Sequence, residues 1–185
     1  MLPLKAEVVR TEARNHLEDP PGYANTVIGD LLSEVSHLDE RIRQYDAHIR
    51  TMARDCALAQ CLMQLKGVGE TTSTALVAMM GNASEFDNGR QLAARPGVVP
   101  GQSARAARRA WRQSKVGDPY IRSLLVLGTG AVLNAAANKT DSLSRWALGL
   151  RERRGYWQAV VAIAAKNART AGAVLTGGES FVLRT

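Results

Sequence analysis

A narrow apolar stripe along residues 24–54 is the most regular pattern in this chain. Apolar side chains recur every three or four positions over four heptads, with charged residues such as Asp39 and Arg41 between them. The stripe consists of Ile28, Leu31, Val35, Leu38, Ile42, Tyr45, Ile49 and Met52. This spacing predicts a long helix with a coiled-coil seam that must lie against another helix. The partner is either the same helix of a second copy or another helix of this chain. A homodimer or higher oligomer through residues 28–52 is favoured, because no other segment carries a matching heptad run.

Two shorter apolar helices are predicted within residues 58–81, on either side of Gly67-Val68-Gly69. The sequence LKGVGETTSTALVA is typical of a helix-hairpin-helix. Gly67 and Gly69 let the backbone turn tightly and leave amide N–H groups open at the start of the second helix, where a DNA phosphate can be held. A packing corner with glycine at the helix end is the alternative. Glu70 suits the helix dipole but repels a phosphate.

A polar segment follows, and in it Ser103 lies among arginines. Val98 and Val99 are predicted to be buried just before it. If residues 102–116 are helical, four arginines share one face that could follow a phosphate strand. The DNA-binding candidates in this segment are Arg105, Arg108, Arg109, Arg112 and Lys115.

Three more helices are predicted after this segment. Asp118-Pro119 combines an N-cap acid with proline at the first helical position, and Asp141 caps the next helix, which ends at Gly155. The last helix begins at Tyr156 and is mostly apolar, with Lys166 on its polar side as a further DNA-binding candidate. Because no strand pattern is present, the predicted class is all-α. The predicted parts are an N-terminal extension (1–23), a coiled-coil arm (24–54), a compact helical domain (55–178) and a tail (179–185).

Charge adds a prediction about the partner. The net charge of +7 and the pI of about 9.9 favour an anionic partner, nucleic acid ahead of membrane. Between Arg90 and Arg122 there are eight basic residues against one acid. A solvated basic face is the alternative explanation.

Other functional classes find less support in the sequence. Cys56 and Cys61 have no zinc-ligand spacing and form no cluster with the three histidines, so we expect buried free thiols, no metal site and no cofactor. No apolar run approaches the roughly 20 residues of a membrane span. The N-terminus lacks the apolar core of a signal peptide. These features predict a cytoplasmic protein without a membrane partner.

Four motifs in order resemble the C-terminal transposase domain of the DEDD-type insertion-sequence transposases, which are RNA-guided recombinases. The motifs are FDNGRQLAARPGVVPGQS, SKVGDPYIRSLLVLGTGAVL, KTDSLSRWALGLRERRG and AIAAKNARTAGAVLTGGE. The resemblance covers residues 58–179 and implies that Ser103 is a catalytic nucleophile that attacks DNA and forms a transient phosphoserine link. A serine hydroxyl needs a base and cations for this chemistry. The arginines supply cations, but the loop contains no His, Asp or Glu.

The chain departs from the family pattern in two places. The family's serine is followed by Ser or Thr and then Gly-Gly-Lys, whereas Ser103 is followed by Ala104, Arg105, Ala106 and Ala107. The RuvC-like domain of the family, with four metal-binding acids, has no counterpart here. A divalent metal is therefore expected only in that domain, and the chain is expected to be inactive alone.

Three functional hypotheses remain open. The chain is a transposase module that binds DNA or a guide RNA duplex and takes part in transposition by recombination. Alternatively, it is a catalytically inactive nucleic-acid-binding remnant, or a structural coiled-coil dimer without a nucleic-acid partner.

Overall fold

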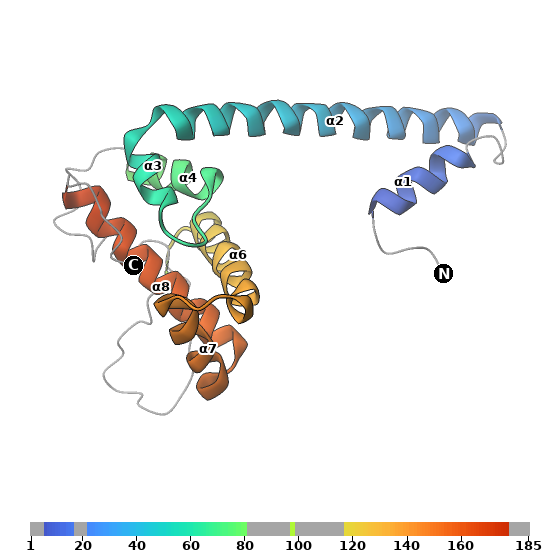
Figure 1. Ribbon diagram of the computed structural model, residues 1–185. Helices are drawn as coiled ribbons and strands as arrows, with labels where there is room; N and C mark the ends of the chain where they lie inside the picture. Colours follow the sequence, from blue (N-terminus) through green and yellow to red (C-terminus); the bar gives the residue numbers. More distant parts are fainter. Residues whose placement is uncertain (1–5, 17–21, 81–96, 99–116, 178–185) are drawn as a thin grey trace. The chain divides into compact units, whose positions relative to one another are not determined.

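The computed structural model describes residues 6–16, 22–80, 97–98 and 117–177, and every regular element in these ranges is a helix (Figure 1). The prediction of an all-α protein is therefore confirmed. The chain divides into a first unit, Met1–His48, and a second unit, Ile49–Thr185. The helices are α1 (Ala6–Asn15), α2 (Gly22–Asp55), α3 (Ala57–Met63), α4 (Glu70–Met80), α6 (Pro119–Ala135), the short 3-10 helix η2 (Ala136–Asn138), α7 (Ser142–Arg154) and α8 (Tyr156–Gly177).

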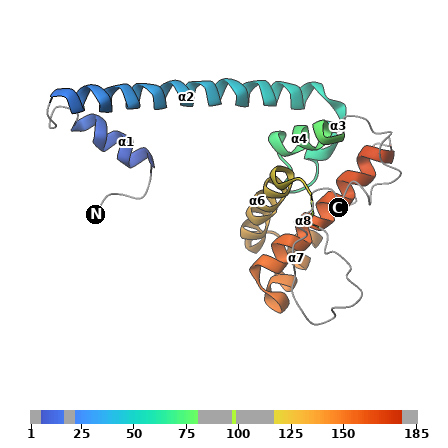
Figure 2. The same cartoon turned by 180° about the vertical axis from the view of Figure 1, so that it is seen from behind.

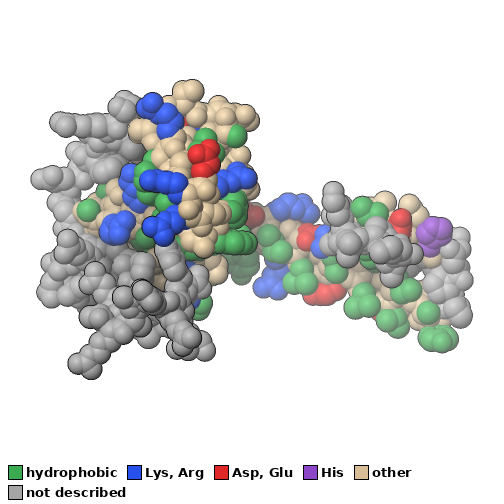
Figure 3. Space-filling view, turned by 90° about the horizontal axis from the view of Figure 1, so that it is seen from below, with side chains coloured by type: hydrophobic (Ala, Val, Ile, Leu, Met, Phe, Trp, Pro, Cys, Tyr) green, Lys and Arg blue, Asp and Glu red, His purple; other side chains and the backbone are tan. Residues whose placement is uncertain are grey.

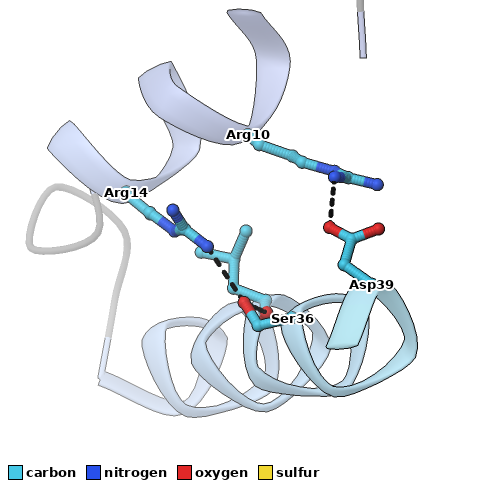
Figure 4. Close-up of polar contacts among 5 residues, drawn as sticks. Arg10, Arg14, Ser36 and Asp39 are labelled. Carbon is cyan, nitrogen blue, oxygen red and sulfur yellow. Dashed lines mark hydrogen bonds and ion pairs between the residues drawn. The ribbon is translucent and has the colours of Figure 1, made fainter. Parts of the chain in front are cut away.

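In the first unit, polar contacts link α1 to α2 (Figure 4). The Arg10 guanidinium lies 2.6 Å from the Asp39 carboxylate, and Arg14 donates to the Ser36 hydroxyl at 2.9 Å. The Ser36 hydroxyl in turn donates to the carbonyl of Leu32 at 2.8 Å. Arginine side chains are long enough to bridge two neighbouring helices, so these contacts hold α1 on the Ser36–Asp39 flank of α2.

The predicted heptad helix is present as α2, but its seam lies largely open in the single chain. Leu31 is 61% exposed, Ile42 57% and Tyr45 59%, and Leu38 and Met52 are exposed as well. The contacts of α1 with Ser36 and Asp39 leave these side chains uncovered. The helix is therefore confirmed, whereas its coiled-coil partner stays a prediction.

The second unit is organised around α8, which packs against both α6 and α7 (Figures 1 and 2). Alanines on α8 permit this close approach, and Ala164, Ala168 and Ala171 are all buried. One buried cluster joins α3, α4, α6 and α8 through residues that include Leu62, Leu76 and Leu125. A second cluster, which consists of Leu133, Ala147, Ala159, Val160 and Ile163, joins the other ends of α6 and α8 to α7.

The predicted helix ends are confirmed in detail. The Asp118 carboxylate accepts from the backbone N–H groups of Tyr120 at 2.8 Å and Ile121 at 3.2 Å, with Pro119 at the first helical position. Asp141 caps α7 in the same way, by accepting from the N–H of Ser144 at 3.1 Å. Gly155 ends α7 with φ of +91°, a conformation that side chains other than glycine rarely adopt.

Two smaller expectations are also confirmed or corrected. Val98 is buried in the first core cluster as predicted, while Val99 lies outside the described residues. Cys56 and Cys61 are free thiols but only half-buried, which corrects the expectation of burial. Cys56 is the N-cap of α3, and Cys61, inside that helix, only borders the first core cluster. Within the described ranges, no three His, Cys, Asp or Glu side chains are grouped to hold a metal ion.

One described segment is long and apolar enough to cross a membrane by length and composition. It is Pro119–Asn138, which spans 20 residues. The expectation that no apolar run approaches this length was therefore wrong. Glycine, alanine and threonine lie between the larger apolar residues of this segment, but they add no charge, so its mean hydropathy stays high. Within the second unit, Ile121, Leu125 and Leu133 of this segment are buried against neighbouring helices.

Candidate nucleic-acid interface

The turn between α3 and α4 packs tightly against α6 at one pair of glycines. Gly67 has φ of +87°, and a Cβ atom built on it would lie 2.8 Å from the carbonyl oxygen of Gly128. A Cβ atom on Gly128 would lie only 2.0 Å from the carbonyl oxygen of Gly67. Neither position has room for a side chain. Gly67 therefore allows the α3–α4 hairpin, which consists of these two helices and the turn between them, to pack on α6.

Two polar contacts fix the same turn to α7 and α8. The Lys66 ammonium lies 2.6 Å from the Asp141 carboxylate, and the Asn167 side-chain amide donates to the Lys66 carbonyl at 2.8 Å. The side-chain bond from Lys66, helped by hydrogen bonds from Ser144, holds the pKa of Asp141 well below its usual range. The turn between α3 and α4 is therefore held in place by contacts with α6, α7 and α8.

Gly69 differs from Gly67 because it lies in the open. It is exposed, and a Cβ atom built on it would meet nothing within 4 Å. Its carbonyl accepts the first hydrogen bond of α4, from the N–H of Ser73 at 2.8 Å. The close packing of Gly67 on α6 agrees with the packing-corner interpretation. The phosphate contacts predicted at Gly67 and at Gly69, beside the exposed carboxylate of Glu70, stay predictions.

Lys166 is the third predicted DNA-binding residue that the structure describes. Its side chain is exposed, and the ammonium lies 5.2 Å from the centroid of the Trp146 ring, in cation–π range. Its neighbour Asn167 bonds the Lys66 carbonyl, so the backbone of Lys166 runs close to the hairpin. The remaining candidates lie outside the described residues: Ser103, Arg105, Arg108, Arg109, Arg112 and Lys115.

Charge is distributed unequally between the two units. The described part of the first unit is acidic, with seven carboxylates against four basic residues. The described part of the second unit has five carboxylates against eleven basic residues, which are Arg50, Arg54, Lys66, Arg122, Lys139, Arg145, Arg151, Arg153, Arg154, Lys166 and Arg169. The positive charge of the chain therefore belongs to the second unit even without the arginines of residues 99–116.

Sequence reasoning missed one group of exposed residues, at the junction of α7 and α8. Arg151, Arg153 and Arg154 form the last turn of α7 and are exposed, and Trp157, in the first turn of α8, is 69% exposed. Figure 3 shows several Lys and Arg side chains close together on the face of the second unit that carries α7. The signal was the run RERRGYW, in which three arginines precede two aromatic residues.

Comparison with known proteins places these features in a family context. Residues 59–144 match the model of the family described as "Transposase IS116/IS110/IS902 family". The chain is 39% identical over 157 residues to a "Probable family 20 transposase" of Pseudomonas aeruginosa, covering 84% of this chain and 46% of that protein. It is 35% identical over 156 residues to the "Transposase for insertion sequence element IS1111A" of Coxiella burnetii, covering 84% of this chain and 43% of that protein.

A third relative is the "Putative transposase y4pF/y4sB" of Sinorhizobium fredii, which is 29% identical over 154 residues, 82% of this chain and 38% of that protein. The chain thus spans less than half the length of these curated relatives. The matches support a transposase domain in this chain, one that contains both the hairpin and the polar segment around Ser103.

Proposed function

We propose that this chain is the C-terminal part of an insertion-sequence transposase, which binds DNA and takes part in transposition by recombination. The observation that carries the proposal is the family match over residues 59–144. The charge distribution supports it, because eleven basic residues against five acids in the described part of the second unit suit a polyanionic partner. In the DEDD-type transposases that the chain resembles, a guide RNA and a metal-binding RuvC-like domain complete the recombination machinery.

Ser103 is the proposed nucleophile. Its hydroxyl oxygen attacks a phosphorus atom of the DNA backbone, a phosphoserine bond forms, and the phosphodiester bond to one sugar oxygen breaks. The proton lost by the serine passes to the leaving sugar oxygen. Guanidinium groups of Arg105, Arg108, Arg109 and Arg112 stabilise the negative charge that accumulates on the phosphate oxygens.

Two measurements test the proposal. A gel shift with duplex DNA from element ends should show binding whose affinity falls steeply with salt, with a log–log slope of roughly −0.9 per phosphate contacted. When the RuvC-like domain is supplied, the wild-type chain should form a covalent adduct with cut DNA. Ser103→Ala should abolish the adduct, whereas the control Ser114→Ala should retain it. An adduct that survives Ser103→Ala would refute the assignment of the nucleophile.

A catalytically inactive remnant is the second candidate. It is favoured by the residues after Ser103, where Ala104, Ala106 and Ala107 provide less backbone freedom than the family's glycines. Such a remnant would bind DNA with the same salt dependence but form no adduct under any condition. A structural dimer without nucleic acid, the third candidate, would show no gel shift.

The exposed seam of α2 supports self-association through residues 28–52. Each large apolar side chain that a second copy covers contributes roughly 1.5–3 kcal/mol when fully buried. The α1 helix contacts the Ser36–Asp39 flank and leaves the seam uncovered. A second copy of α2 is therefore the proposed occupant of the seam.

Analytical ultracentrifugation tests whether a second copy of α2 covers the seam. Leu38→Lys together with Ile42→Lys should shift the chain to monomer, because both side chains lie on the seam. The matched control, Ser33→Lys together with Gln44→Lys, adds the same charge to exposed positions off the seam and should leave the oligomer intact. Equal behaviour of the two double variants would rule out the seam as the interface.

A further inference from the structure

We infer that the junction of α7 and α8 binds an unpaired base of a nucleic-acid strand, with Trp157 as the stacking platform and neighbouring arginines as phosphate contacts. This inference rests on the proposed function, since it assigns a second contact surface to the same nucleic-acid-binding unit. The starting observation is that Trp157, a large aromatic residue, is 69% exposed although α8 is otherwise the most buried helix of the unit.

The junction holds Trp157 in place without covering it. Gly155, with φ of +91°, turns the chain directly from α7 into α8 and places Trp157 three positions after Arg154. Tyr156 packs edge-to-face on Trp157, with ring centroids 5.3 Å apart, and also packs against the second core cluster. The Arg151 guanidinium lies 5.9 Å from the Tyr156 ring. Trp157 is therefore anchored through its neighbour and keeps most of its own surface free for a ligand.

The surrounding charge selects an anionic ligand. Arg151, Arg153 and Arg154 are exposed in the last turn of α7, against one acid, Glu152. The helix dipole accounts for cations at this end of a helix, but it does not account for an exposed indole beside them. Guanidinium groups pair with phosphate oxygens in a bidentate geometry that suits a nucleic-acid backbone.

The combination of an aromatic face with arginines points to a strand whose bases are unstacked. Every base has a π-face that stacks on an indole, and this contact tolerates different sequences. In an intact duplex these faces are occupied by neighbouring bases. The ligand is thus a single-stranded segment, a strand end or an opened junction, of DNA or RNA.

Fluorescence isolates this contact. In the double variant Trp111→Phe and Trp146→Phe, Trp157 is the sole tryptophan, and its emission should be quenched on titration with a short oligothymidine or oligouridine. The tighter of the two identifies the strand as DNA or RNA. Blunt duplex should quench little. If this variant does not fold, as judged by circular dichroism, the substitutions below decide the question alone.

Substitutions supply the second readout. Trp157→Ala in the otherwise unchanged chain should weaken single-strand binding by roughly 5- to 150-fold, the range of stacking contacts with one base. Duplex affinity should change little, and Trp157→Phe should retain most of the single-strand affinity. Arg153→Gln together with Arg154→Gln should weaken binding of all strands and reduce the salt slope by roughly two.

The outcomes separate this inference from the proposed function. Salt-dependent duplex binding without an effect of Trp157→Ala on single strands would overturn only the inference. Absence of binding to every nucleic acid would overturn both. A Trp157 emission that responds to protein concentration instead of nucleic acid would assign the ring to a protein interface and overturn the inference as well.

Discussion

Replacing Gly128 by alanine should destabilise the second unit, although it introduces a better helix-forming residue. Gly128 lies inside α6, where alanine is ordinarily favoured over glycine by roughly 1 kcal/mol. At this position, however, the added Cβ atom would stand 2.0 Å from the carbonyl oxygen of Gly67. Both partners of this contact are main-chain atoms or attached directly to them, so neither can rotate away, and the hairpin must move.

The size of the effect follows from what the hairpin loses when it moves. Overpacking of a filled core costs roughly 1–3 kcal/mol and occasionally more. A shift of the hairpin also stretches the Lys66–Asp141 ion pair at 2.6 Å and the bond from Asn167 to the Lys66 carbonyl at 2.8 Å. After subtraction of the gain in helix propensity, we expect a net loss of about 2 kcal/mol or more in the free energy of unfolding.

Urea denaturation followed by circular dichroism measures this loss, with Gly149→Ala as the control. Gly149 lies inside α7, and a Cβ atom there would meet nothing within 4 Å. Gly149→Ala should therefore raise the free energy of unfolding by roughly 0.5–1 kcal/mol. The two glycine-to-alanine changes should have opposite signs. If Gly128→Ala is as stable as the wild type or more stable, the close contact with Gly67 does not exist in solution.

Three further predictions concern single polar groups. Asp118→Ala removes the cap of α6 and should lower the free energy of unfolding by about 1 kcal/mol in the same urea assay, whereas Asp118→Asn should retain most of it. The folded-state pKa of Asp141 lies below that of the unfolded chain, so its contribution to stability is complete above a pH of about 4 and is lost as the pH falls further. Asp141→Asn or Lys66→Met should flatten this acid dependence in urea titrations between neutral and acid pH, and an unchanged profile would contradict the assigned ion pair. Asn167→Ala leaves the Lys66 carbonyl without its side-chain donor and should cost roughly 1–3 kcal/mol, whereas a neutral result would show that water replaces the amide.

Local signals in the sequence were sufficient for the helix ends. Asp118-Pro119, Asp141 and Gly155 act on backbone groups within four positions of themselves, so their roles could be predicted without knowledge of the fold. The seam of α2 was likewise visible as a periodic pattern, because one helix sets its own spacing.

Contacts between distant parts of the chain could not be predicted in the same way. Asn167 and Lys66 are 101 positions apart, and nothing in either neighbourhood specifies the other. Trp157 lies between an arginine run and a mostly apolar helix, so its local sequence does not decide whether it is buried or exposed. The structure buries Ala159, Val160, Ile163 and Ala164 instead, and the helical period then turns Trp157 outward. Ser103 was assigned through resemblance alone, since a serine among arginines has no distinctive spacing.

The charged link between α1 and α2 has a practical consequence for solution work. The Arg10–Asp39 pair is about one-third exposed on each side, so dissolved ions weaken it over the concentration range in which they also compete for phosphate. In a salt series on the whole chain, the release of α1 from α2 and the dissociation of nucleic acid therefore occur over the same range of salt concentration. Deuterium uptake at the amides of residues 8–15 reports the first event, and the same series on Asp39→Asn, in which α1 is already loosened, yields the second by itself.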